Sequence, residues 1–167
     1  MDRNIRNYAA MLVQSPHASA ELKGSAVYPN IHGTVRFYQT RNGVLIAADV
    51  SGLPNSHDIC KYPVFGFHIH DGGQCEGDMQ DPFSGAMAHY NSADCKHPFH
   101  AGDLPPLFGN HGYAFSVFLT ERFLLSKVIG KTVIIHGNPD DFTTQPSGNA
   151  REKLACGVIT ACRSRCR

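Results

Sequence analysis

The sequence predicts an all-β domain, an antiparallel Greek-key sandwich or flattened barrel with two long functional loops. Seven or eight short runs alternate between apolar and polar residues, which is the period of a half-buried strand. An Asn-Gly pair, which favours a tight hairpin turn, joins two of these runs. Two long polar segments, 71–110 and 137–152, show almost no periodicity, and helical spacing is scarce. This combination is typical of antiparallel β domains.

The first third of the chain contains a short helical pattern and three expected strands. Within residues 1–16 four apolar residues recur at helical spacing, namely Ile5, Tyr8, Ala9 and Leu12. This N-terminal arm is either a short helix or a frayed leader. Alternation with period two then predicts strands over 18–23, 34–39 and 44–50. Between the last two we expect a turn at Asn42-Gly43, because both central residues of a tight turn need positive φ.

The fourth expected strand, residues 64–70, has two faces of different chemistry. Its apolar side chains point to one side, and they are Phe65, Phe67 and Ile69. Because side chains alternate along a strand, His68 and His70 point to the other side, where Gly66 leaves space beside them. The polar segment 71–110 follows. A loop of this length in a compact domain is usually functional.

The remaining strands are shorter and are separated by the second polar loop. We expect strands over 113–119, 131–136 and 154–159, because apolar residues alternate or run together there. Residues 120–129 fit either an irregular segment or a short helix. The polar segment 137–152 connects the last two strands.

Length and composition limit the classes of function. A chain of 167 residues fits one domain that can bury its own core. A net charge of +1 and the lack of a dense Lys/Arg run argue against nucleic-acid binding. No apolar run approaches the roughly 18 residues of a membrane span, and no apolar signal segment follows the first charged residues. We therefore expect no nucleic-acid or membrane partner, and either an intracellular protein or a mature exported form.

Histidines are concentrated in residues 64–103. The stretch contains His68, His70, His89, His97 and His100, and Asp103 closes it. The first two share one strand face about 6–7 Å apart, so they can converge on one metal ion or remain solvated surface residues. The last two and the carboxylate are spaced as a loop that offers nitrogen and oxygen ligands, which suit zinc.

Several short motifs follow one another in a fixed order. They are Gly66-Phe-His-Ile-His70, His89-Tyr-Asn91, His97, His100-Ala-Gly-Asp-Leu104, His136-Gly-Asn-Pro-Asp-Asp141, Gly148-Asn-Ala150 and Leu154-Ala-Cys-Gly-Val-Ile159. In this order they resemble the copper/zinc superoxide dismutase family over roughly residues 18–160. The resemblance implies an immunoglobulin-like Greek-key β-sandwich. It also implies dismutation of superoxide to dioxygen and hydrogen peroxide by copper redox cycling, with a bridging histidine supported by zinc.

The resemblance implies a role for each matching residue. Copper would be held by His68, His70, His89 and His136. Zinc would be held by His89, His97, His100 and Asp103. Asp140 would link a copper histidine to a zinc histidine, and Cys75 and Cys156 would form the intrasubunit disulfide. The remaining cysteines, Cys60, Cys95, Cys162 and Cys166, have no implied role, and the last two either pair with each other or across chains or stay free.

One position departs from the family pattern. Three residues before the second disulfide cysteine the family usually has an arginine that attracts the anionic substrate, whereas this chain has Lys153. Arg151 lies two residues earlier. Because lysine lacks the planar fork of arginine, we expect either Lys153 or a rearranged Arg151 to attract superoxide.

Two rival functions also fit parts of the sequence. His68-Ile-His70-Asp71 superficially resembles a binuclear metallo-hydrolase motif, but glycines follow it and the chain has little helix. The second rival is a non-catalytic copper-binding or copper-delivery module on the same fold, and the full ligand set argues against it.

We expect an arm (1–16), a dismutase-like domain (17–161) and a basic cysteine-containing tail (162–167). The last strand resembles the segment that forms dimers in eukaryotic members, which suggests a homodimer.

Overall fold

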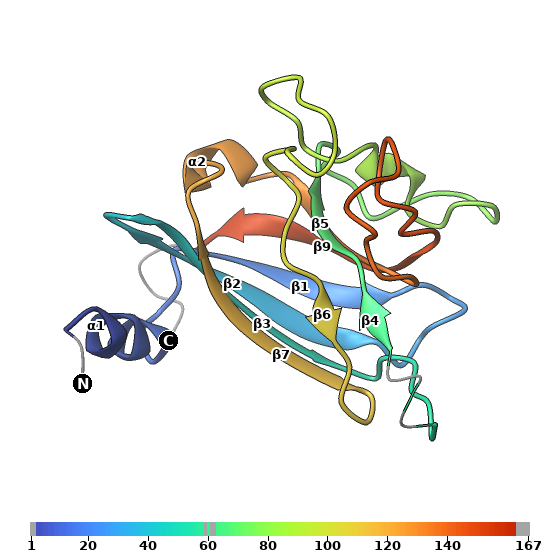
Figure 1. Ribbon diagram of the computed structural model, residues 1–167, viewed down its shortest axis with the longest axis horizontal. Coiled ribbons are helices and arrows are strands. Elements are labelled where there is room, and N and C mark those ends of the chain that lie inside the picture. The colour runs from blue at the N-terminus through green and yellow to red at the C-terminus, as the bar shows by residue number, and fades with distance from the viewer. Residues whose placement is uncertain (1–2, 59, 61–62, 163–167) are drawn as a thin grey trace.

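The main feature of the computed structural model, which describes residues 3–58, 60 and 63–162, is a seven-stranded antiparallel sheet. Its strand order is β5-β8-β9-β1-β2-β3-β7, and β4 and β6 form a second sheet. The strands are β1 (Ala18–Gly24), β2 (His32–Thr40), β3 (Gly43–Ser51), β4 (Val64–Phe65), β5 (Phe67–His70), β6 (Leu107–Phe108), β7 (Tyr113–Thr120), β8 (Thr132–His136) and β9 (Lys153–Ala161). Figure 1 shows the sheet curled into a half-barrel, with β5 and β9 above β2, β3 and β7. The predicted antiparallel all-β fold is confirmed.

The hydrophobic core fills the inside of this curl. Phe65, Phe67 and Ile69 belong to it, as the alternation in this segment predicted. His68 and His70 lie on the opposite face, yet their side chains are also buried, at 0% and 2% exposure. The long loops therefore cover the histidine face, so the reading as solvated surface histidines is wrong.

Gly66 divides the segment that the sequence predicts as one strand. Its N–H donates to the carbonyl of Asn138, and its own carbonyl accepts from the N–H of His136. A Cβ at this position would lie 3.0 Å from the Cβ of Ala150, tighter than ordinary contact. The second long loop thus packs directly on the backbone here, and the strand divides into β4 and β5.

The hairpin between β2 and β3 forms as predicted, but its turn is displaced by one residue. Thr40 pairs with Gly43, so the turn residues are Arg41 and Asn42. Of residues 40–43 only Gly43, which follows the turn, has a positive φ, at 120°. The hydroxyl of Thr40 accepts from the N–H of Asn42 and donates to the carbonyl of Gly43, which holds this turn without positive φ at its centre.

Short helical segments lie outside the sheets. The N-terminal arm forms α1 (Arg3–Leu12), and the segment left open at 120–129 contains the single turn α2 (Leu125–Val128). A 3₁₀ turn, η2 (Ser84–Ala86), lies in the first long loop. The helix α1 covers part of the outer face of β2 and β3, where these residues pack together: Tyr8, Met11, Leu12, Tyr38, Leu45 and Ala47. No helix in the described part of the chain is long and apolar enough to span a membrane.

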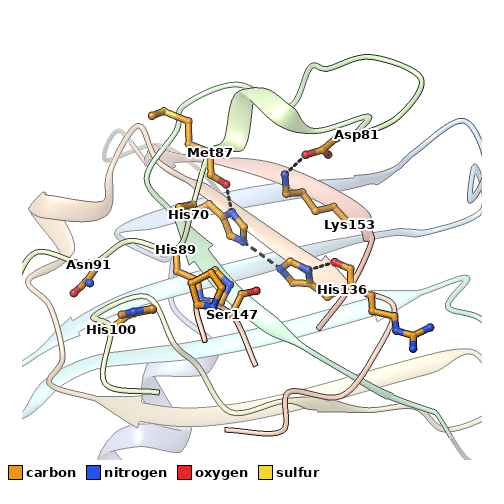
Figure 2. A pocket seen from close by; sticks show the side chains of 12 residues that line it. His70, Asp81, Met87, His89, Asn91, His100, His136, Ser147 and Lys153 are labelled. Atoms are coloured by element: carbon orange, nitrogen blue, oxygen red, sulfur yellow. Dashed lines mark hydrogen bonds and ion pairs between the residues drawn. The ribbon is translucent and has the colours of Figure 1, made fainter. Parts of the chain in front are cut away.

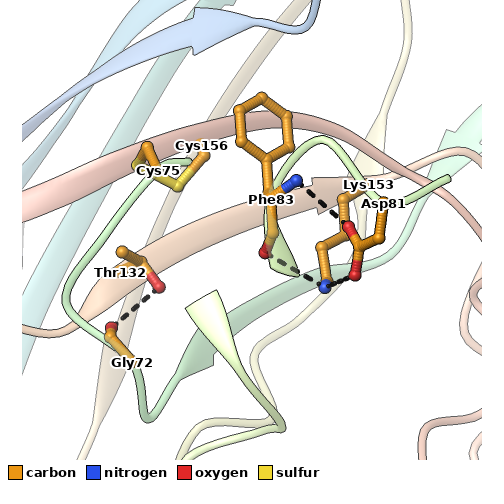
Figure 3. Close-up of a disulfide and its surroundings, with 7 residues drawn as sticks. All are labelled: Gly72, Cys75, Asp81, Phe83, Thr132, Lys153 and Cys156. Carbon is orange, nitrogen blue, oxygen red and sulfur yellow. Dashed lines mark hydrogen bonds and ion pairs between the residues drawn. A yellow bond between two sulfur atoms is a disulfide. The ribbon is translucent and has the colours of Figure 1, made fainter. Parts of the chain in front are cut away.

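A disulfide between Cys75 and Cys156 joins the first long loop to β9 (Figure 3). The two Cα atoms are 5.6 Å apart, and 81 residues separate the cysteines in sequence. Both pack with a small apolar cluster of Phe83, Ala86 and Ile134. The pairing implied by the family resemblance is therefore present. Cys60, Cys95 and Cys162 are free, and Cys166 lies outside the described residues, which leaves its pairing a prediction.

Replacing both disulfide cysteines with alanine should lower the free energy of unfolding of the metal-free protein by about 2–5 kcal/mol, because the cross-link restricts a long loop in the unfolded chain. Urea denaturation followed by circular dichroism measures the change. The exposed free thiol of Cys60 provides the control, since Cys60→Ser should change stability by less than about 0.5 kcal/mol. Equal stabilities of the double variant and wild type would contradict this role.

Candidate metal centre

Two buried groups of candidate ligands lie side by side where β5 and β8 meet the long loops. His68 and His70 stand on β5, and His136 ends the neighbouring strand β8. The first long loop is held against β5 by isolated bridges from His89 to His70 and from Asp103 to His68. All seven predicted ligand residues are at most 7% exposed, namely His68, His70, His89, His97, His100, Asp103 and His136.

The first group is His68, His70, His89 and His136, whose candidate ligand atoms all lie within 4.8 Å of one another. Backbone carbonyls hold the outer nitrogens of two rings (Figure 2). His70 Nδ1 donates to the carbonyl of Met87 at 2.7 Å, and His136 Nδ1 donates to that of Arg151 at 3.1 Å. These contacts assign the proton of each neutral ring to Nδ1.

The inner nitrogens of these two rings face each other. His70 Nε2 and His136 Nε2 are 3.1 Å apart, and with Nδ1 protonated both carry lone pairs. Facing lone pairs repel unless a cation or a proton lies between them. His68 Nδ1 and His89 Nε2 are also buried and have no hydrogen-bond partner. Four inward lone pairs in one buried space fit a metal ion with nitrogen ligands.

The second group is His89, His97, His100 and Asp103. Asp103 Oδ1 is 2.8 Å from His89 Nδ1, and Asp103 Oδ2 is 3.1 Å from His97 Nδ1 and 3.4 Å from His100 Nδ1. The last two nitrogens are buried and make no hydrogen bond. Three nitrogens and one carboxylate oxygen are a ligand set that suits tetrahedral zinc. His89 belongs to both groups, with one ring nitrogen turned to each.

Asp140 connects the two groups. Its Oδ2 accepts from His68 Nε2 and its Oδ1 from His97 Nε2, both at 2.8 Å. Each ring therefore turns its Nδ1 toward the candidate metal position. Gly148, with φ of +65°, packs against this contact, and a Cβ there would lie 2.0 Å from Asp140 Oδ1 and 2.7 Å from His97 Nε2. The structure thus contains Asp140 between one histidine of each group, as the resemblance implied.

Burial keeps three histidines of the first group, His68, His70 and His136, in the neutral form that can bind a metal. Burial and, to a smaller extent, the neighbouring His68 lower the pKa of His136 to about 3. Burial likewise lowers the pKa values of His68 and His70. For Asp140, burial raises the pKa, but hydrogen bonds from His68, the N–H of Phe142 and His97 outweigh it and bring the value to about 2. At neutral pH these imidazoles are neutral and the carboxylate is ionised.

An open pocket of about 510 Å³ leads to the first group. It is lined by His70, Asp81, Met87, Ala88, His89, Asn91, His100, His136, Pro146, Ser147, Arg151 and Lys153. The two predicted substrate-attracting cations differ in their surroundings. Lys153 Nζ donates to Asp81 Oδ2 and to the carbonyl of Phe83, whereas Arg151 has no ion-pair partner among the residues the structure describes.

Some residues that shape this site belong to no recognisable sequence pattern. The carbonyls of Met87 and Arg151 orient ligand rings, but any residue could supply a carbonyl. Asp81, which binds Lys153, lies 72 residues from it in the sequence and belongs to no motif of the resemblance. Folding brings these groups together at the pocket, and only the three-dimensional structure shows that they meet there.

The curled antiparallel sheet and the two adjacent ligand groups define a β-sheet metalloprotein with a candidate binuclear centre. Comparison with known proteins identifies the family of this metalloprotein. The family model for copper/zinc superoxide dismutase matches residues 31–159, so the chain belongs to that family. The fold resembles that of the Cu/Zn superoxide dismutase from Brucella abortus with a TM-score of 0.71, at 22% identity over 84% of this chain and 98% of that one.

Curated relatives agree with the family match. The chain is 33% identical to superoxide dismutase [Cu-Zn] 2 of Aquifex aeolicus, over 90% of this chain and 94% of the relative. It is 34% identical to superoxide dismutase [Cu-Zn] of Legionella pneumophila, over 76% of each chain. These comparisons give no support to the copper-delivery module or to the metallo-hydrolase.

The metal-free protein should lose stability as the pH falls below about 6.5. The folded-state pKa of His136 is about 3, below the ordinary value of 6.5, so between these values the unfolded chain binds more protons than the folded one. Asp140, at about 2 instead of 3.8, adds a loss of the same sign at lower pH.

Urea midpoints measured from about pH 7 to about pH 4 test this prediction. His136→Gln removes the titrating group, so its midpoint should fall less over this range than that of wild type. A fall of equal size in both proteins would contradict the assignment to His136.

Proposed function

We propose that the first group holds the copper of this dismutase and the second group its zinc. Copper is assigned to His68, His70, His89 and His136, and zinc to His89, His97, His100 and Asp103. As a member of its family the chain dismutates superoxide to dioxygen and hydrogen peroxide, with copper and zinc as cofactors. The observation that carries the assignment is the set of buried, inward ring nitrogens that have no hydrogen-bond partner or face a second lone pair.

His89 has the central role in this proposal. Copper, when bound, supplies a one-electron couple that oxidises one superoxide and reduces another, whereas zinc has no redox chemistry. His89 Nδ1 faces Asp103, which fixes the ring, and His89 Nε2 is buried without a hydrogen-bond partner in a residue that lines the pocket. His89 Nε2 is therefore the atom at which the chain can hold a proton and give it to the departing peroxide.

Asp140 orients one histidine of each site. Asp140 holds His68 and His97 in the required tautomer, and loss of such an outer contact usually lowers metal affinity about tenfold to a hundredfold.

Residues 17–161 form the dismutase-like domain in this proposal, with 1–16 as an arm and 162–167 as a tail that lies almost wholly outside the described residues. A homodimer remains a prediction, and light scattering measures it.

His136→Gln should reduce bound copper well below one ion per chain and lower superoxide consumption by at least about a hundredfold, because one of four copper ligands is lost. Zinc content should stay near that of wild type. Elemental analysis and a superoxide-consumption assay measure the two effects. His57→Gln, at an exposed position outside both groups, is the matched control.

Other results would point to the rival functions. One copper and one zinc per chain without superoxide consumption by wild type would favour the copper-binding module. Zinc at both sites would favour the hydrolase. Full copper content in His136→Gln would contradict the ligand assignment.

Arg151 is the cation that we assign to attracting superoxide, since it lines the pocket without an ion-pair partner among the described residues. Arg151→Gln should lower kcat/KM about twofold at low ionic strength, the effect of one charge about 10 Å away in water. Added salt should reduce the difference, because it screens exposed charges. A rate unchanged at every ionic strength would rule Arg151 out.

A further inference from the structure

Two links, one covalent and one ionic, join the first long loop to β9. The disulfide connects Cys75 to Cys156, and close by Asp81 pairs with Lys153 (Figure 3). Family membership accounts for the disulfide. Asp81 belongs to neither ligand group, although it lines the pocket.

Asp81 is also the centre of a tight turn in the loop. Its Oδ1 accepts from the N–H of Phe83 at 3.1 Å, while Oδ2 faces Lys153. Its carbonyl accepts from the N–H groups of Asp78 at 3.0 Å and Ser84 at 3.1 Å. Its own N–H donates to Asp78 Oδ1 at 2.9 Å. Asp81 thus holds the loop through its backbone and Oδ1 and attaches it to β9 through Oδ2.

The turn around Asp81 leads directly to a proposed copper ligand. The 3₁₀ turn Ser84–Ala86 follows it, and the carbonyl of the next residue, Met87, accepts from His70 Nδ1 at 2.7 Å. The N–H of Gly85 donates to the carbonyl of Glu76 and closes this part of the loop. The position of the carbonyl that orients His70 therefore depends on where the turn is anchored.

The same ion pair changes the charge of the pocket. Asp81 and Lys153 both line it, and their opposite charges are in contact. The side chain of Lys153 is 14% exposed and that of Asp81 is 42% exposed. An approaching anion meets a nearly neutral pair at this wall, whereas the charge of Arg151 is uncompensated among the described residues.

We propose that Asp81 is a positioning residue that fixes the first long loop against β9 through Lys153 and withdraws the charge of Lys153 from substrate attraction. The anchored turn presents the Met87 carbonyl to His70. The electrostatic half of this proposal rests on the proposed function. The anchoring half concerns the folded chain alone and can be tested without metals.

The anchoring half is tested by the rate at which a dithiol reduces the disulfide in the metal-free protein. Asp81→Asn can retain the contact with the Phe83 N–H but loses the ion pair, and Lys153→Gln loses it from the other side. Both should speed reduction severalfold, because a loosened loop exposes the disulfide more often. Glu76→Gln is the control: it removes an exposed carboxylate from the same loop and should reduce at the wild-type rate.

The electrostatic half is tested by kcat/KM against ionic strength in the metal-loaded enzyme. Asp81→Asn should raise kcat/KM about twofold at low ionic strength and steepen its decline with salt, because Lys153 gains an uncompensated charge. Lys153→Gln should lower it about twofold and flatten the decline. In the double variant the salt dependence should return toward that of wild type, since the net charge of the pair is zero again.

Each half has a result that overturns it. Reduction of the disulfide at the wild-type rate in both single variants would overturn the anchor. A salt dependence unchanged by Asp81→Asn but flattened by Lys153→Gln, alone and in the double variant, would show that Lys153 already acts as a free cation. If wild-type enzyme carrying both metals consumed no superoxide, the proposed function would fail, and the reduction rates would still decide the anchor.

Discussion

The two ligand groups depend on one buried carboxylate, that of Asp140. A histidine ring can present either nitrogen to a metal, and the choice is set by what the other nitrogen touches. Asp140 uses one oxygen for His68 and the other for His97, so both rings turn Nδ1 inward. Burial alone would disfavour the charged carboxylate, but three hydrogen bonds keep it ionised. The absence of a side chain at Gly148 leaves the space in which this contact forms.

Much of the fold follows from local pattern, and the exceptions involve long-range contacts. Alternation identified the strands and placed Phe67 and His68 on opposite faces. It could not show that the strand divides at Gly66, because the cause is the backbone of the second long loop. The strand β6 has only two residues, too few for a periodic signal. The Asn-Gly pair indicated the hairpin, while the hydroxyl of Thr40 decided which residues form its turn.

In the candidate site, too, some residues could be predicted from local sequence and others could not. Its ligands carry distinctive chemistry at distinctive spacings, so motif order predicted all seven positions that the structure brings together. The groups that orient the ligands are largely backbone carbonyls, and their identity leaves no trace in the sequence. The same holds for Asp81, since an aspartate in a polar loop is ordinary until its partner Lys153 is seen beside it.

With the proposed ligand assignment, the position of His89 in both groups makes the binding of the two metals thermodynamically linked. By reciprocity, the factor by which zinc changes the affinity for copper equals the factor by which copper changes the affinity for zinc. Under the proposed assignment two cations share this imidazole, and their mutual repulsion opposes joint occupancy. The occupancy of either site is therefore a property of the pair.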